Sequence, residues 1–193
     1  MSYTELKQGK AVSIKDNLSI ALIKQEDLKD IIAMFDDERV NKYLFFAPAD
    51  ESLYQAFFIP IIENTEQSLA DNKWPDSPTF VIRNEQGEYM GMCALSQVMF
   101  HQGNYEVGYQ LPFKAWGKGI ATQVCEILTE LGFSELGAHK ICADCYAGNV
   151  GSYKTLQKCG YRQEGRMTNY YKLETGFDDK LYYGITKAQF DAL

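Results

Sequence analysis

Residues 116–121, Trp-Gly-Lys-Gly-Ile-Ala, have the composition of an anion-binding turn. They follow a strand-like run, 105–111, and open a segment with helical spacing of apolar residues. The apolar positions are Ile120, Val124, Ile127, Leu128 and Leu131. The first turn of a helix has unpaired backbone N–H groups, and the helix dipole adds roughly half a positive charge there. Gly117 and Gly119 would let a ligand approach the backbone closely. The stretch predicts an anion site, although a bare Gly-x-Gly is equally compatible with a tight turn.

Two common phosphate-binding motifs do not fit this turn. A P-loop needs Gly-Lys-Ser/Thr after a spaced glycine, and the dinucleotide fingerprint needs a third glycine where Thr122 stands. The turn resembles instead the pyrophosphate loop of the GNAT acetyltransferase superfamily, Gln/Arg-x-x-Gly-x-Gly/Ala, with Trp116, Gly119 and Ala121 at its defined positions. The tryptophan departs from the general pattern. However, Trp-Gly-Lys-Gly is frequent in the Rim-type branch, which acetylates the amino termini of ribosomal proteins.

A second stretch resembles the other coenzyme A motif of this superfamily. The sequence predicts a strand at Lys140–Tyr146 and a following helix, with Asn149 as its N-cap and Gly160 as the residue at which it ends. The motif is Asn-x-x-Ser/Ala followed by Gly-Phe/Tyr eleven residues after the asparagine, and Ser152 and Tyr161 complete the match. The two motifs together identify the chain as similar to GNAT enzymes.

The resemblance implies a binding site for acetyl-CoA and no metal. In the family the coenzyme lies in a V-shaped split between the fourth and fifth strands, here 105–111 and 140–146. The pantetheine arm pairs with backbone at the end of the fourth strand, like an added strand. The implied cofactor-binding residues are Gln110, Leu111, Trp116, Gly117, Lys118, Gly119, Ile120, Ala121, Asn149 and Ser152.

Acetyl transfer to an amine needs a neutral amine, a polarised carbonyl and a proton for the leaving thiolate. Family members often place a catalytic carboxylate on the fourth strand, and Glu106 is the candidate here, acting directly or through water. A solvated strand glutamate is the alternative. Tyr109 should lie on the opposite face of the strand. The usual tyrosine acid is replaced by Leu156, so Ser152 is the candidate donor, or else a residue that only satisfies the helix backbone.

Length and composition describe an ordinary globular chain. The sequence has 193 residues, 46% hydrophobic and 23% charged, which is compatible with a single domain spanning 1–193. Neither a membrane-spanning run nor a secretory signal is recognisable, so a cytoplasmic location is expected. The five cysteines do not form a disulfide framework. Cys142 and Cys145 form a C-x-x-C within a probable strand, which favours buried thiols over a metal site.

The net charge of −7 limits the partners that the chain can have. Nucleic acid is disfavoured because phosphate contacts need a basic face. A cationic amine acceptor is compatible with this charge, although the charge can equally serve only solubility. The Glu164-Gly165 turn and the Asp178-Asp179 pair are candidates for facing such an acceptor, with solvated turns as the alternative. A homodimer is left open.

The order of elements predicts an α+β fold. A strand at 18–24 precedes helices at 25–35, 38–44 and 50–70, the last containing Pro60. Strands at 80–83, 89–98 and 105–111 follow, then the helix, strand and helix of the two motifs. A hairpin of 166–173 and 180–186 closes the chain around a turn at 174–178. This is the GNAT order: a mixed, mostly antiparallel sheet flanked by helices and splayed between the fourth and fifth strands.

The leading hypothesis is an N-acetyltransferase that passes the acetyl group of acetyl-CoA directly to an amine, such as the N-terminal amine of a ribosomal protein. A small amine or antibiotic is the alternative acceptor. The aromatic segment 43–62 is a candidate acceptor wall or simply core. The second hypothesis is a catalytically silent sensor that binds acyl-CoA, and the only feature that favours it is Leu156 in place of the usual tyrosine. A structural domain with a fortuitous loop is the third.

Overall fold

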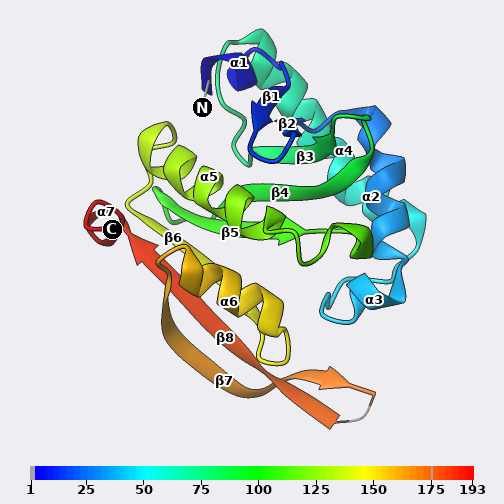
Figure 1. Cartoon of the computed structure of the whole chain (residues 1–193), viewed down its shortest axis with the longest axis vertical. Coiled ribbons are helices and arrows are strands. Elements are labelled where there is room, and N and C mark those ends of the chain that lie inside the picture. Colours follow the sequence, from blue (N-terminus) through cyan, green and yellow to red (C-terminus); the bar gives the residue numbers. More distant parts are fainter. Residues whose placement is uncertain (1–2, 175) are drawn as a thin grey trace. The chain divides into compact units, whose positions relative to one another are not determined.

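The structure is a computed structural model that describes residues 3–174 and 176–193. Met1, Ser2 and Thr175, the last within the predicted closing turn, lie outside the described residues. The contacts group the chain into two compact units. Unit 1 comprises Met1–Ser96 and Tyr109–Ile120, and unit 2 comprises Gln97–Gly108 and Ala121–Leu193. Figure 1 labels their helices and strands.

In unit 1, the strands β1 to β4 are paired in chain order, each antiparallel to the next. The turn between β3 and β4 is the predicted hairpin turn. β1 was not predicted, because three residues are too few to display an alternating pattern. The bounds are β1 Val12–Ile14, β2 Leu18–Leu22, β3 Thr79–Asn84 and β4 Tyr89–Gln97.

The helices of unit 1 cover one face of this sheet with aromatic and aliphatic side chains. α2 and α4 pack on Val81, Tyr89 and Met92 of the strands. Within the predicted aromatic segment, Tyr54 and Phe58 belong to this core, whereas Phe45 and Phe57 are exposed. The bounds are α1 Tyr3–Lys7, η1 Gln25–Asp27, α2 Leu28–Phe35, α3 Glu38–Asn41, α4 Glu51–Ala70 and η2 Phe113–Ala115.

Unit 2 contains a mixed sheet in the order β5-β6-β8-β7. β5 is parallel to β6, whereas β8 is antiparallel to both β6 and β7. The predicted strand 140–146 is β6 with the same bounds. The bounds are β5 Asn104–Gln110, α5 Ile120–Ser134, β6 Lys140–Tyr146, α6 Val150–Lys158, β7 Arg162–Leu173, β8 Gly176–Thr186 and α7 Lys187–Phe190.

The parallel pairing of β5 with β6 is short. Its register joins Asn104–Glu106 to Lys140–Cys142 and ends there, although β5 continues to Gln110 and β6 to Tyr146. The fourth and fifth predicted strands are β5 and β6, since the unpredicted β1 shifts the count. Their pairing therefore stops at Glu106, where the predicted split begins.

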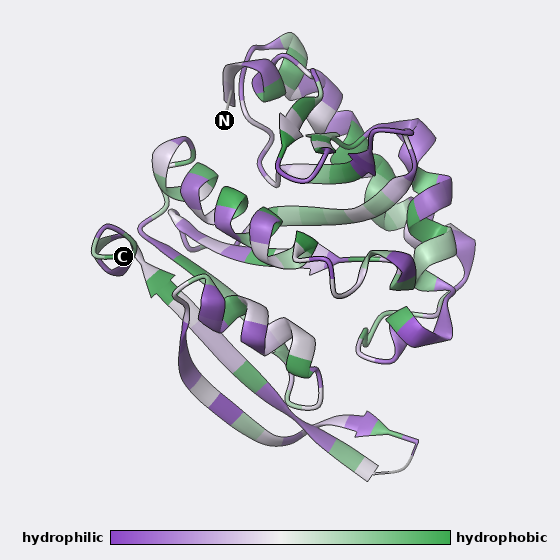
Figure 2. Ribbon diagram, viewed as in Figure 1, coloured by the Kyte–Doolittle hydropathy of each residue, from purple (hydrophilic) through white to green (hydrophobic). Residues whose placement is uncertain are grey.

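The helices α5 and α6 are amphipathic, and Figure 2 shows apolar and polar bands alternating around α5. Val124, Leu128 and Leu131 of the predicted apolar stripe are buried. A buried hydrogen bond of 2.7 Å joins Thr129 Oγ1 to the hydroxyl of Tyr161, the residue predicted to follow the Gly160 stop. This hydrogen bond joins the predicted second coenzyme A motif to α5.

Two predicted acidic turns are strand residues instead. Glu164 lies in β7 at a register shift, and its carboxylate pairs with Lys140 at 2.6 Å. Asp178 and Asp179 lie in β8, because that strand begins at Gly176 rather than after the predicted turn. Asp178 accepts a hydrogen bond from the backbone of Gly148, and Asp179 pairs with Arg166. Each of these carboxylates thus has a partner within the protein, and a bound substrate is not needed to account for its position.

None of the helices in the described ranges has the length and apolarity that would be needed to cross a bilayer.

Gly91 of β4 is expected to be intolerant of a side chain. Its φ is +141°, and a Cβ there would lie 2.4 Å from Leu111 Cδ2 and 2.7 Å from the Gln110 carbonyl oxygen. Gly87 also has a positive φ, +76°, but a Cβ there meets nothing within 4 Å. We expect Gly91→Ala to lower the free energy of unfolding by about 1–3 kcal/mol more than Gly87→Ala does, because of overpacking. Urea unfolding of both variants measures this difference, and equal losses would contradict it.

Candidate functional site

The glycine turn of unit 1 presents open backbone immediately before α5. Gly117 and Gly119 have φ values of +71° and +77°, a region that disfavours side chains. A Cβ built on either glycine meets no atom within 4 Å. Space for a ligand therefore exists beside the backbone, and the first turn of α5 adds the N–H groups and dipole that favour an anion. The open turn is compatible with the predicted anion site, and the binding of a pyrophosphate there stays a prediction.

Trp116 fastens this turn to the end of β5. Its indole Nε1 donates a hydrogen bond of 2.8 Å to the carbonyl of Leu111. Its ring lies 5.3 Å from that of Phe113, over which Arg39 is stacked at 4.3 Å. Among the predicted cofactor residues, the structure thus brings Leu111 and Trp116 together. The indole takes one lone pair of the Leu111 carbonyl and leaves the other for a ligand.

In unit 2, Asn149 caps α6 as predicted. Its Oδ1 accepts a hydrogen bond of 3.2 Å from the backbone N–H of Ser152, which leaves the amide Nδ2 as its donor group towards a ligand. Burial raises the pKa of the Cys145 thiol to about 11, and a hydrogen bond with the Ser152 side chain partly opposes this rise. The Ser152 hydroxyl therefore has a protein partner. Leu156 is fully buried in the core.

Glu106 lies at the last paired position of β5, opposite Cys142 of β6. Its side chain is accessible to solvent, yet surrounding protein atoms deprive the carboxylate of part of its hydration. This loss of hydration is the largest cause that raises the pKa of Glu106 above its ordinary value. The negative charge of Asp144 raises it further, and the positive charge of Lys180 partly opposes both.

Asp144 and Lys180 form a charged pair near Glu106 that the sequence did not predict. Lys180 Nζ lies 2.7 Å from Asp144 Oδ2, and the Tyr171 hydroxyl donates to Asp144 Oδ1 at 3.2 Å. The ring of Tyr171 stacks on that of Tyr146 at 3.6 Å between centroids. One signal for Asp144 was available in the sequence: it follows Cys142 by two residues on the same strand, so the two side chains share a face of the sheet. Glu106 is opposite Cys142 and therefore lies on that face too. Lys180, the partner from β8, could not be predicted, because its position beside Asp144 depends on the register between β6 and β8, which no local sequence pattern specifies.

The C-x-x-C residues behave as predicted for a strand. Cys142 is half-buried and Cys145 is buried, on β6, and burial raises the pKa of each thiol to about 11. Within the described part of the chain, no group of three or more His, Cys, Asp or Glu side chains is arranged to hold a metal ion.

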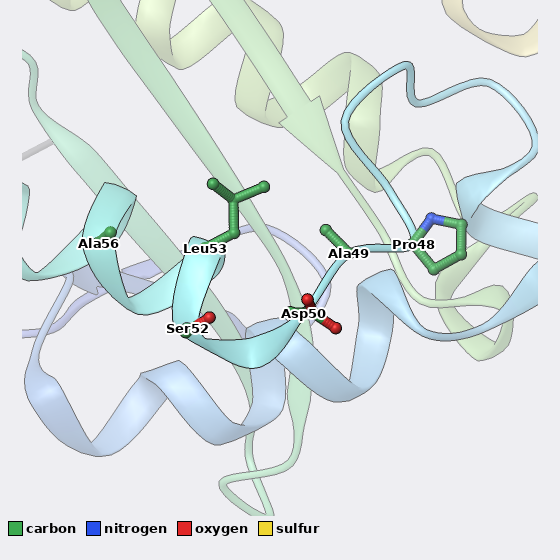
Figure 3. Close-up of a pocket in the computed structure, with 6 residues that line it drawn as sticks. All are labelled: Pro48, Ala49, Asp50, Ser52, Leu53 and Ala56. Atoms are coloured by element: carbon green, nitrogen blue, oxygen red, sulfur yellow. The ribbon is translucent and has the colours of Figure 1, made fainter.

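Unit 1 has an open depression of ≈ 850 Å³ at the start of α4, remote from these motifs in sequence. Its lining comes from the loop before α4 and from the first turns of that helix (Figure 3). The lining residues are Pro48, Ala49, Asp50, Ser52, Leu53 and Ala56. Asp50 is the one ionisable group among them, so this surface lacks the paired groups that acid–base chemistry needs.

Comparison with known proteins connects these motifs to one family. Residues 17–162 match the family described as "Acetyltransferase (GNAT) domain". The uncharacterized N-acetyltransferase p20 of Bacillus licheniformis is 24% identical, over 91% of this chain and 96% of that protein. The putative ribosomal N-acetyltransferase YdaF of Bacillus subtilis (strain 168) is 23% identical, over 92% of this chain and 96% of that protein.

Among solved structures, a spermidine N-acetyltransferase from Vibrio cholerae in complex with CoA and spermine is similar with a TM-score of 0.73. The two chains are 19% identical, and the match covers 91% of this chain and 99% of that one. A likeness at this identity establishes the fold alone. The predicted α+β fold, with a mixed and mostly antiparallel sheet flanked by helices, is confirmed.

The electrostatic influence of Asp144 on Glu106 predicts that substitution of Asp144 changes the pKa of Glu106. We expect Asp144→Asn to lower the pKa of Glu106, because the variant removes a negative neighbour and leaves Lys180 to favour the ionised form. Carboxyl ¹³C NMR titration, with the Glu106 resonance assigned from Glu106→Gln, measures the shift. The control is Asp179→Asn, which removes a β8 carboxylate paired with Arg166 and should leave the Glu106 pKa unchanged. An unchanged or higher pKa in Asp144→Asn would contradict the coupling.

Proposed function

The chain belongs to the GNAT acetyltransferase family, and from this membership we propose that it acetylates the N-terminal amine of a protein, such as a ribosomal protein, in the manner of the Rim-type branch. As a member of the family it is an N-acetyltransferase with acetyl-CoA as the acetyl donor. The proposal concerns its acceptor, its branch and its catalytic residues. It takes residues 1–193 as a single acetyltransferase domain.

Two sequence features support the branch. The loop has the sequence Trp-Gly-Lys-Gly, and Leu156 stands in place of the usual tyrosine. Both this loop sequence and the absence of the tyrosine are frequent in Rim-type enzymes. The relative YdaF, a putative ribosomal N-acetyltransferase, matches nearly the whole chain. The acidic net charge of −7 is compatible with a cationic N-terminus on a basic substrate protein.

The observation that carries the catalytic assignment is the environment of Glu106. A carboxylate with a raised pKa is a better proton acceptor than an ordinary glutamate, and Glu106 has this property at the point where β5 and β6 stop pairing. We assign it the role of general base. It removes a proton from the acceptor ammonium, directly or through a water, so that the neutral amine can attack.

The reaction needs no covalent enzyme intermediate. The amine nitrogen bonds to the thioester carbonyl carbon, and the carbon–sulfur bond then breaks to release the coenzyme A thiolate. The thiolate takes a proton, for which Ser152 is the proposed donor, and the serine regains a proton from the attacking nitrogen, which loses its second proton as the amide forms. Since the Ser152 hydroxyl is hydrogen-bonded with Cys145, this role requires it to rotate towards the sulfur of the leaving group.

The residues proposed to bind acetyl-CoA act through their backbone more than through their side chains. The turn from Trp116 to Ala121 would hold the pyrophosphate, with Lys118 adding a positive charge. Gln110 and Leu111 would pair with the pantetheine arm by backbone hydrogen bonds. Asn149 would add a donor from its Nδ2.

Two other functions give different experimental outcomes. A polyamine or another small amine is the competing acceptor, since a related fold is that of a spermidine N-acetyltransferase. An acetyl-CoA sensor would bind the coenzyme without acetylating any amine. A screen of N-terminal peptides, polyamines and aminoglycosides with the purified protein separates these functions.

Binding of acetyl-CoA should depend on the glycine turn. We expect Gly119→Glu to weaken binding by more than roughly 100-fold, because the carboxylate would meet the pyrophosphate in the space that the glycine leaves open. Isothermal titration calorimetry measures this loss. Gly137→Glu is the matched control: Gly137 also has a positive φ, +67°, and open space, but lies after α5 and should retain binding. If the wild-type protein does not bind acetyl-CoA, the enzyme and sensor functions are both wrong.

Acetylation should depend on Glu106 and on pH. We expect Glu106→Gln to lower kcat/KM by roughly 10²- to 10⁴-fold with little change in acetyl-CoA binding, because only proton removal is lost. In the wild type, kcat/KM should rise with pH through the Glu106 pKa, which lies above the ordinary 4.5, since the ionised form is the base. Glu126→Gln, on the exposed face of α5, is the control.

The stability of the Glu106→Gln variant should not fall at neutral pH. The folded protein raises the pKa of Glu106, so it binds more protons than the unfolded chain just above pH 4.5, and ionisation of Glu106 costs stability as pH rises through that window. Glutamine removes that cost. Full activity in Glu106→Gln would refute the assignment of Glu106 as the base.

A further inference from the structure

The ammonium group of Lys180 is held in a cage made by its own chain. Lys180 Nζ lies 2.7 Å from Asp144 Oδ2 and 5.0 Å from the ring centroids of both Tyr170 and Tyr182. Its side chain is only 13% exposed. A carboxylate combined with aromatic faces is the arrangement by which proteins recognise organic ammonium ions. Here an internal ammonium occupies that arrangement.

The cage lies on the sheet face that carries Glu106. Glu106 is opposite Cys142, and Asp144 follows Cys142 by two residues on the same face. Tyr182 is opposite Asp144 across the β6–β8 pairing, and Lys180 precedes Tyr182 by two. The electrostatic influence of both Asp144 and Lys180 on the carboxylate of Glu106 is consistent with this placement. An acceptor amine at Glu106 is therefore a neighbour of the cage.

Lys180 keeps its charge in this environment. Burial alone would lower its pKa, but the hydrogen bond to Asp144 and the charge of Asp144 outweigh burial and raise it. The cage consequently presents a positive charge, with the Asp144 carboxylate already neutralised, beside the place where an ammonium must bind. A second ammonium on the acceptor would meet Lys180 rather than a free carboxylate.

We propose that Lys180 is a specificity-determining residue, which fills the cage and excludes acceptors with a second ammonium close to the reacting amine. The acceptor class is then an amine with a single positive charge near its reacting end, such as a protein N-terminus followed by uncharged side chains. Polyamines are excluded. This inference rests on the proposed function and deepens it, because it selects between the two acceptor classes left open there.

The test compares two acceptors by kcat/KM: spermidine, and a tetrapeptide with a free N-terminal alanine and uncharged side chains. The wild type should prefer the peptide. Lys180→Met empties the cage and frees the Asp144 carboxylate, so it should raise the ratio of kcat/KM for spermidine to kcat/KM for the peptide by about tenfold or more, an effect typical of a desolvated cation site. The ratio is the measure, because the variant also removes a positive charge that acts on Glu106 and so changes proton removal from both acceptors alike.

Three further variants control this result. Lys180→Arg retains a cation in the cage and should keep the wild-type preference. Lys180→Met combined with Asp144→Asn empties the cage but removes its carboxylate, so the gain for spermidine should be lost. Lys172→Met, on the exposed surface of β7, should leave both values unchanged. Thermal unfolding of each variant confirms that it is folded.

Failure of this inference is distinguishable from failure of the proposed function. If the wild type acetylates the peptide but prefers spermidine, or if Lys180→Met leaves the preference unchanged, the specificity role of Lys180 is overturned and the acetyltransferase activity stands. If the wild type acetylates neither acceptor, the proposed acceptor class is wrong. Calorimetric titration of spermidine then tests the cage directly: tighter binding to Lys180→Met than to the wild type supports it, and equal binding overturns it.

Discussion

The short parallel pairing of β5 with β6 is the constraint on which the proposed chemistry of Glu106 depends. It holds Asn104–Glu106 against Lys140–Cys142 and then ends, while both strands continue. Backbone groups beyond the last pair are released from the ladder and must find other partners, such as a ligand that binds as an added strand. Because Glu106 is the last paired residue, its carboxylate is fixed at the beginning of this divergence.

The charges near Glu106 are balanced by groups from another strand. Asp144 alone would repel the Glu106 carboxylate, and Lys180 of β8 compensates for this by pairing with Asp144 at 2.7 Å. Tyr171 of β7 donates to the other oxygen of Asp144. Desolvation is the largest cause of the raised pKa of Glu106 on β5, and Asp144 of β6 and Lys180 of β8 adjust that pKa in opposite directions. If Glu106 is the base, as proposed, the β7–β8 hairpin influences catalysis through Lys180, although it contains none of the residues predicted to be catalytic.

The sequence predicted the features that depend on local chemistry. The Asn149 cap, the Gly160 stop with its φ of +85° and the bounds of β6 follow from residue type and spacing. The Asp144–Lys180 pair does not, because it depends on the register between strands that are far apart in the chain. Asp178 and Glu164 were assigned to turns for the same reason: their fixed partners lie on other elements.

At two positions where this chain departs from the family pattern, the residue that it has instead plays a structural role in the fold. Trp116 stands where the loop usually has Gln or Arg, and its indole bonds to Leu111, so it joins the anion turn to the strand end that precedes it. Leu156 stands where a tyrosine acid is usual, and it is fully buried, so no acid–base group is available there. In the proposed mechanism, proton transfer therefore relies on Glu106 as the base and Ser152 as the donor, and the charges of Asp144 and Lys180 act on the first of these two groups.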